Sequence, residues 1–66
     1  MAVAKVIEIL AESEISWEEA TKEAVKEVAK SIHHIQSVYV ESMQAVVKDN
    51  QIVKYRVNAK VTFIVE

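Results

Sequence analysis

Apolar and polar side chains alternate along residues 51–65, and this pattern limits the fold of the chain more than any other feature of its sequence. Strict alternation is typical of a β-strand that is buried on one face only. The apolar set is Val53, Tyr55, Val57, Ala59, Val61, Phe63 and Val65, and the polar set is Lys54, Arg56, Asn58, Lys60 and Thr62. The sequence therefore predicts a long C-terminal strand with one face in the core.

Two further strands and a tight turn follow from the same kind of pattern. Val3–Leu10 is rich in β-branched side chains interrupted by charged ones, which predicts a first strand, and residues 37–47 predict a second. The chain contains no glycine and no proline, so its turns must use Asn, Asp or Ser. We expect breaks at residues 11–16 and 48–51, the second being a hairpin turn with Asn50 in the left-handed region.

The segment between these breaks has the pattern of one helix of about 17 residues. Ser16 and Glu19 have the spacing of a capping box, in which each side chain bonds the backbone N–H of the other residue. His33 and His34 are adjacent, so on a helix they cannot chelate one ion together, and we expect them in the last turn.

An apolar stripe recurs along the predicted helix at three- and four-residue steps. Its members are Trp17, Ala20, Ala24, Val25, Val28, Ala29 and Ile32.

The predicted order of elements is strand, helix, strand, strand. A hairpin of the last two strands, with the first strand added at its edge, gives a three-stranded antiparallel sheet whose apolar face is covered by the helix. The sequence therefore predicts a single α+β domain over residues 1–66, a β-α-β-β subunit. A strand of fifteen residues spans about 50 Å and the helix about 25 Å, so the sheet must bend strongly or extend to other subunits.

The size and composition of the chain indicate self-association. Its 66 residues contain no cysteine, yet 52% of them are hydrophobic and only 6% are aromatic. A chain this small has little interior and no disulfide to stabilise it, and burial against copies of itself is a common remedy. We therefore expect a homo-oligomer.

Charge and hydropathy argue against several other partners. A formal net charge of −2 at pH 7 is not the basic footprint of a nucleic-acid-binding protein. No run approaches the roughly 18 apolar residues of a membrane span. Glu8 and Glu12 interrupt the N-terminal apolar run before it reaches the length of a signal peptide. We expect a cytoplasmic protein that binds neither nucleic acid nor membrane.

The sequence contains no arrangement typical of catalysis. Cysteine is absent, and the serines have no base and orienting partner at a recognisable spacing. A phosphate-binding loop requires glycine, which the chain lacks. The carboxylates do not have EF-hand spacing, and Asp49 alone in a turn is no calcium loop, so we assign no metal ligand. The sequence predicts a protein that is not an enzyme.

Three segments resemble the dodecins, a family of small flavin-binding proteins. They are KVIEI at residues 5–9, SWEEA at residues 16–20, and YRV at residues 55–57 with Val61 and Phe63 on the same strand. The resemblance extends over the whole chain. It implies a strongly bent sheet that partly wraps around the helix, and twelve subunits closed into a hollow homododecamer with tetrahedral symmetry. It also implies reversible binding of flavins such as FMN or riboflavin, without turnover.

The positions that hold flavin in dodecins carry different residues in this chain. The resemblance places Ser37 where those proteins have a tryptophan that stacks on the flavin, and Arg56 where they have a glutamine that hydrogen-bonds its polar edge. A serine lacks the stacking surface of an indole, so we expect flavin binding to be weakened. Tyr39, on the same strand face, either offers a weaker platform or, as we favour, packs at a subunit contact. Arg56 either donates to a ligand or, as we favour, forms an intersubunit ion pair with Glu41 or another acid.

The resemblance also implies a structural, packing role for the sole tryptophan, Trp17, at the helix start. Some dodecins that lack the flavin tryptophan are associated with calcium. The sequence thus predicts a hollow shell that sequesters or buffers a small ligand at Ser37, Tyr39 and Arg56, flavin being the family's ligand. The alternative is a structural or calcium-holding shell without flavin.

Overall fold

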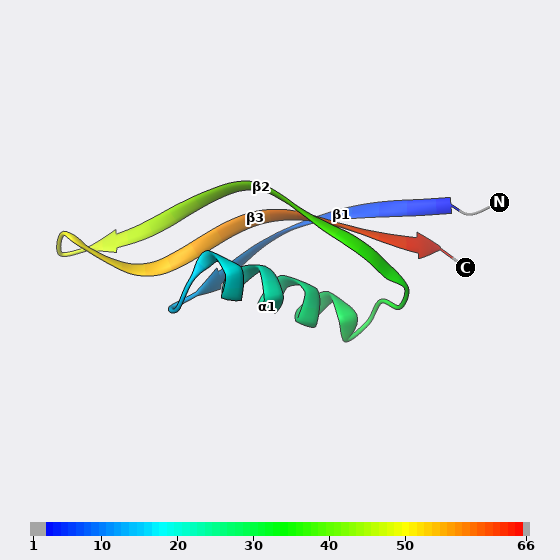
Figure 1. Cartoon of the computed structure of the whole chain (residues 1–66), viewed down its shortest axis with the longest axis horizontal. Helices are drawn as coiled ribbons and strands as arrows, with labels where there is room; N and C mark the ends of the chain where they lie inside the picture. Colours follow the sequence, from blue (N-terminus) through cyan, green and yellow to red (C-terminus); the bar gives the residue numbers. More distant parts are fainter. Residues whose placement is uncertain (1–2, 66) are drawn as a thin grey trace.

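The computed structural model describes residues 3–65 and confirms the β-α-β-β order. Three strands form one antiparallel sheet in the order β1-β3-β2, so that β3 lies in the middle and pairs with both neighbours. The helix α1 packs on one face of this sheet (Figure 1). The elements are β1 (Val3–Ser13), α1 (Trp17–Ala29), β2 (Ile35–Lys48) and β3 (Gln51–Val65).

The alternation of β3 decides which side chains face the helix. Val57 and Val61 are fully buried, and their Cα partners on β1 are Ala11 and Ile7. Small alanines on α1 let the helix approach the sheet closely, because their side chains add little height to the helix surface. The buried apolar core consists of Ala20, Ala24, Val28, Val57, Ala59 and Val61.

The start of α1 is as predicted, but its end is not. Ser16 is the N-cap, and its hydroxyl oxygen accepts a hydrogen bond from the Glu19 N–H at 3.0 Å. The helix ends at Ala29 after 13 residues, so the predicted extension to Ile32 is wrong. The Val28 carbonyl accepts from the N–H groups of residues 31 and 32, which closes the helix in a tightened turn.

The two histidines consequently lie outside the helix, contrary to prediction. His34 has a positive φ of 62°, which turns the chain toward β2. Its carbonyl then accepts a hydrogen bond from the Ile64 N–H at 3.1 Å, so this turn is already attached to the sheet. Ile32 is half-buried although it is not helical. Its spacing therefore continues the apolar stripe without continuing the helix.

The first two strands are longer than predicted. β1 continues past Leu10 to Ser13 because Ala11 and Ser13 pair with Val57 and Tyr55 of β3. Of the predicted break at residues 11–16, only the last part remains a turn, supported by a hydrogen bond from the Ile15 N–H to the Ser13 hydroxyl at 2.9 Å. β2 begins at Ile35 and ends at Lys48, slightly beyond both predicted limits.

The predicted hairpin turn joins β2 to β3. Asp49 and Asn50 both adopt positive φ, at 53° and 64°. Two consecutive left-handed residues match the right-handed twist of the flanking strands, which is why two-residue hairpin loops use Asn and Asp when glycine is absent. The sequence predicted Asn50 in this region, and the structure adds Asp49.

The sheet is longer than the helix that covers it. Its extent along the longest axis of the chain is 51 Å, and the hairpin and the free ends of β1 and β3 continue past the two ends of α1 (Figure 1). Irregularities in the pairing of β2 with β3 accompany the bending of the sheet.

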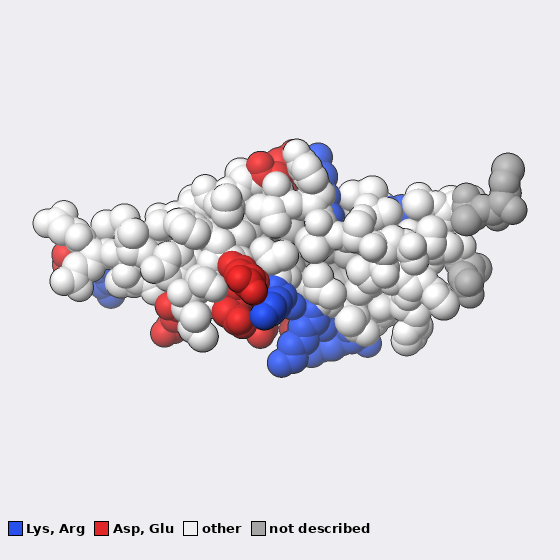
Figure 2. All heavy atoms as spheres, viewed as in Figure 1, with Lys and Arg blue, Asp and Glu red and all other residues white. Residues whose placement is uncertain are grey.

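In Figure 2 charged side chains gather near the middle of the molecule, and the surface toward both ends is mostly uncharged. The exposed large apolar residues are Val3, Val6, Leu10, Ile15, Trp17, Tyr39, Met43, Val47, Ile52, Val53 and Val65.

Candidate functional site

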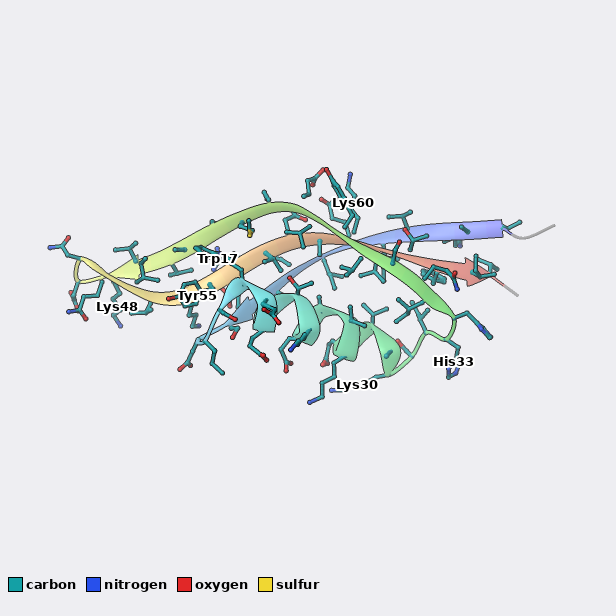
Figure 3. All side chains as sticks on the ribbon, in the orientation of Figure 1. Trp17, Lys30, His33, Lys48, Tyr55 and Lys60 are labelled. Atoms are coloured by element: carbon teal, nitrogen blue, oxygen red, sulfur yellow. The ribbon has the colours of Figure 1, made fainter. Side chains whose placement is uncertain are left out.

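The three candidate ligand residues lie on the sheet face opposite α1, which we call the outer face. Ser37 pairs with Thr62, and Tyr39 pairs with Lys60. Cross-strand partners in an antiparallel sheet point to the same side, and the even-numbered residues of β3 point away from the buried valines. Figure 3 shows Lys60 directed away from the helix.

Tyr39 presents the largest free aromatic surface of the outer face. Its side chain is 64% exposed, and it stands beside Lys60 on the middle strand. Ser37 is also exposed and lies two residues earlier on the same strand face. The structure therefore brings Ser37 and Tyr39 together on open surface.

Arg56 is bound by a carboxylate of its own chain. Its Nε donates to Glu12 Oε2 at 2.8 Å, and its Nη2 donates to the same oxygen. The register places Glu12 directly opposite Arg56, so the contact requires no second subunit. Arg56 thus pairs with an acid other than the Glu41 named from the sequence, and it does so within one chain, where Glu41 contacts Lys60 at 3.0 Å.

Distances along β3 separate Arg56 from the other two residues. The partner of Ser37 is Thr62, which is six residues from Arg56. Six strand residues span about 20 Å. A single subunit therefore does not place Ser37 and Arg56 around one small ligand, and a site that uses both needs two copies of the chain.

The centre of the outer face holds a second ion pair across the strands. The pKa of Glu41 is lowered by a hydrogen bond from Lys60, and next by a hydrogen bond with Glu8. The pKa of Lys60 is raised, chiefly by the same hydrogen bond to Glu41. Glu8 lies on β1 directly opposite Lys60. The ammonium group on β3 thus pairs with Glu41 on one edge strand, and the nearby charge of Glu8 on the other edge strand also raises the pKa of Lys60.

Trp17 connects the start of α1 to the hairpin strands. Its indole meets the Tyr55 ring edge-on, with 4.9 Å between centroids and 76° between planes (Figure 3). Its Nε1 donates to the Gln44 carbonyl on β2 at 2.9 Å. Both contacts are of the kind that buried or half-buried aromatic residues make in packing. They confirm the packing role that the sequence predicted for this residue.

A comparison with known families decides the classification of the chain. The family model described as Dodecin matches residues 3–66. The chain belongs to the dodecin family. No match is found among the curated protein sequences.

Solved dodecin structures have the same fold. A point mutant of the Thermus thermophilus dodecin superposes with a TM-score of 0.94 at 24% identity, covering 100% of this dodecin and 98% of that chain. The dodecin of Streptomyces coelicolor gives a TM-score of 0.94 at 20% identity, covering 98% of this chain and 93% of that one. At these identities the likeness shows the fold alone.

A third structure is closer in sequence. It is the calcium dodecin of Mycobacterium tuberculosis, described as a calcium-chelating immunodominant antigen with a novel calcium-binding site. It is 33% identical to this dodecin, with a TM-score of 0.86, and the match covers 97% of this chain and 91% of that one.

The part of this dodecin that the structure describes contains no ready metal cluster. Among residues 3–65, no three His, Cys, Asp or Glu side chains lie close enough together to hold an ion. None of the helices in that range is both long and apolar enough to cross a membrane.

The role of Glu12 was not recognised from the sequence of this dodecin. Two pairs of opposite charges at facing positions of β1 and β3 indicate it: Glu8 lies opposite Lys60, and Glu12 lies opposite Arg56. Both pairs follow once β1 and β3 are aligned antiparallel, so testing alternative registers for charge complementarity would have found them. Lys54 adds a further cation, 4.0 Å from Glu12 Oε1.

Acid is expected to weaken the outer-face ion pairs of this dodecin. A hydrogen bond from Arg56 lowers the pKa of Glu12 below its ordinary value of 4.5, and the pKa of Glu41 is lowered too. A carboxylate with a lowered folded pKa stabilises the fold above its unfolded pKa, and this stabilisation is lost as pH falls through the folded value. The urea midpoint should therefore decrease below about pH 4.5.

Two substitutions test this pH dependence. Glu12→Gln should flatten the acid limb of the stability profile, since the titrating partner of Arg56 is then absent. Glu14→Gln is the matched control, because Glu14 is an exposed neighbour that forms no ion pair within residues 3–65. Equal acid limbs in Glu12→Gln and Glu14→Gln would contradict the prediction.

Proposed function

We propose that this dodecin assembles into a hollow homododecamer that binds and releases a small ligand without chemical turnover, each subunit being a single domain over residues 1–66. The main support is the imbalance of apolar surface. Within residues 3–65 the core contains six residues, three of them alanine, while eleven large apolar side chains are exposed. A subunit with so little interior gains most by burying that surface against copies of itself.

The proposed ligand is a flavin, FMN or riboflavin, held between the outer faces of two copies of the chain, at Ser37 and Tyr39 of one copy and Arg56 of the other. Tyr39 supplies an open ring beside Lys60, whereas Ser37 supplies no stacking surface. Loss of one stacked aromatic face costs about 1–3 kcal/mol, or roughly one to two decades of affinity. Because Glu12 already engages Arg56, that guanidinium must exchange partners before it binds a ligand. We therefore expect flavin binding to be weak.

A calcium-holding shell is the second candidate. It is favoured by the relative that is 33% identical and is described as calcium-chelating. The cation would lie between subunits, where carboxylates of several copies meet, since the single chain gathers no set of three such groups within residues 3–65. Oxygen ligands from different chains suit calcium, which accepts six to eight of them in flexible geometry.

Three measurements on the purified full chain test these proposals. Light scattering should give a species near twelve times 7.5 kDa, about 90 kDa. FMN fluorescence should be quenched at high protein concentration, and calorimetry with Ca²⁺, with Mg²⁺ as the control ion, tests the alternative. A folded monodisperse monomer would contradict the shell. If FMN fluorescence is not quenched and calorimetry detects binding of Ca²⁺ but not of Mg²⁺, the calcium-holding shell replaces the flavin proposal.

A further inference from the structure

A recess at the hairpin end of the sheet lies apart from Ser37 and Tyr39 of the proposed flavin position and shares Arg56 with it. It has a volume of about 610 Å³ and lies between the hairpin strands and the end of β1. Val46, on its wall, is seven residues beyond Tyr39 on β2, a distance of about 23 Å along the strand. We call this site the hairpin recess. Its lining residues are Glu12, Glu14, Val46, Val47, Lys48, Val53, Lys54 and Arg56.

The apolar part of the hairpin recess is made by three valines. In the single subunit Val47 is 60% exposed and Val53 is 39% exposed, and ligand binding here requires that this surface stays open when copies of the chain assemble. Val46 lies beside them on β2 and is half-buried. A volume of this size falls within the range of small-molecule sites. The recess can therefore accommodate the apolar body of a small organic molecule.

The charges of the hairpin recess favour a monoanion. Three cations, Lys48, Lys54 and Arg56, face two carboxylates, so the lining carries a net charge of 3 − 2 = +1. Glu12 engages Arg56 and lies 4.0 Å from Lys54. Lys48 forms no ion pair within residues 3–65, and it stands at the hairpin end (Figure 3). Its ammonium group is the cation that is free to bind an anion.

We propose that the hairpin recess binds a small amphipathic carboxylate, with its apolar chain against the three valines and its carboxylate on the Lys48 ammonium. One negative charge matches the net charge of the lining. A second would approach the Glu12 and Glu14 carboxylates and be repelled. This binding activity is additional to the proposed flavin or calcium function: the two sites share Arg56, but the groups proposed to contact the carboxylate and its chain, Lys48 and the three valines, belong to the recess alone.

Octanoate is the probe, titrated by calorimetry into the assembled full-length protein. The expected dissociation constant is about 1 mM or tighter. Affinity should rise about twofold per methylene from hexanoate to decanoate, because each added group is partly removed from water. Acetate, which lacks the apolar body, and octanol, which lacks the charge, should bind more weakly. Octanoate binding no tighter than acetate would overturn the proposal.

Two pairs of variants locate the bound molecule, one pair testing the contact of its carboxylate group and the other the contact of its apolar chain. Lys48→Gln should weaken octanoate binding about fivefold, the effect expected of one partly exposed ion pair. Lys26→Gln removes an equally unpaired lysine from the exposed side of α1 and should change nothing. Val47→Ser should weaken binding two- to fourfold, whereas Val3→Ser, at the opposite end of the sheet and similarly exposed, should not.

The outcomes separate this site from the others. Equal effects of Lys48→Gln and Lys26→Gln, or of Val47→Ser and Val3→Ser, would overturn the assignment to the hairpin recess. So would loss of octanoate binding in Tyr39→Ala, since Tyr39 lies on another part of the outer face. Retained octanoate binding in a protein that quenches no FMN would support the recess while the flavin proposal fails.

Discussion

Changing Val61 to Ala is expected to lower the free energy of unfolding by about 2–3 kcal/mol. Val61 is fully buried in the sheet face that α1 covers, and deleting two methyl groups there removes apolar contacts and leaves a cavity. Small domains have a total stability of only about 5–15 kcal/mol, so the loss is a large fraction. Urea unfolding followed by Trp17 fluorescence at one fixed protein concentration measures it.

Val6→Ala is the matched control for this substitution. Val6 is a valine of the same sheet, but it lies on the outer face opposite Thr62 and is 57% exposed. Within the isolated subunit its truncation should cost less than about 0.5 kcal/mol. A larger, concentration-dependent cost would mean that another copy of the chain covers Val6. A Val61→Ala cost as small as that expected for Val6 would contradict the assignment of the core.

The double substitution Ser37→Trp with Arg56→Gln is expected to raise the affinity for FMN about ten- to hundredfold. The indole supplies the stacking face that Ser37 lacks, worth about 1–3 kcal/mol per stacked ring, and a pair of symmetry-related copies would supply two such faces. The glutamine removes the guanidinium that Glu12 now holds. Quenching of FMN fluorescence gives both dissociation constants, measured at equal salt concentration because FMN is charged.

Controls assign the gain to the substituted positions. Arg56→Gln alone should change FMN affinity little, because it adds no stacking surface. Ser42→Trp places an indole on the outer face further along β2, opposite Asn58, and should not confer binding. If the double variant binds no better than the wild type, the alignment of β2 with the flavin-binding dodecins is wrong. A gain in Ser42→Trp would show that any exposed indole suffices.

Local patterns in the sequence determined where most elements begin and turn. The alternation of residues 51–65 predicted β3 with its bounds, since one buried face requires a period of two. The absence of glycine left Asp49 and Asn50 as the residues able to make the hairpin turn. Ser16 marked the start of α1 because its hydroxyl satisfies an otherwise unpaired N–H group. Each of these signals acts over a few residues and is readable without knowing the fold.

The tertiary structure alone decided which residues meet across strands. It lengthened β1 to Ser13, ended α1 at Ala29 and paired Arg56 with Glu12. These outcomes depend on the register of β1 on β3, and a change of register by one residue would exchange the two faces of the strand. It also separated Arg56 from Ser37 by about 20 Å of strand. The sequence could therefore name the candidate ligand residues, but their separation follows from pairings between distant segments, which no local pattern encodes.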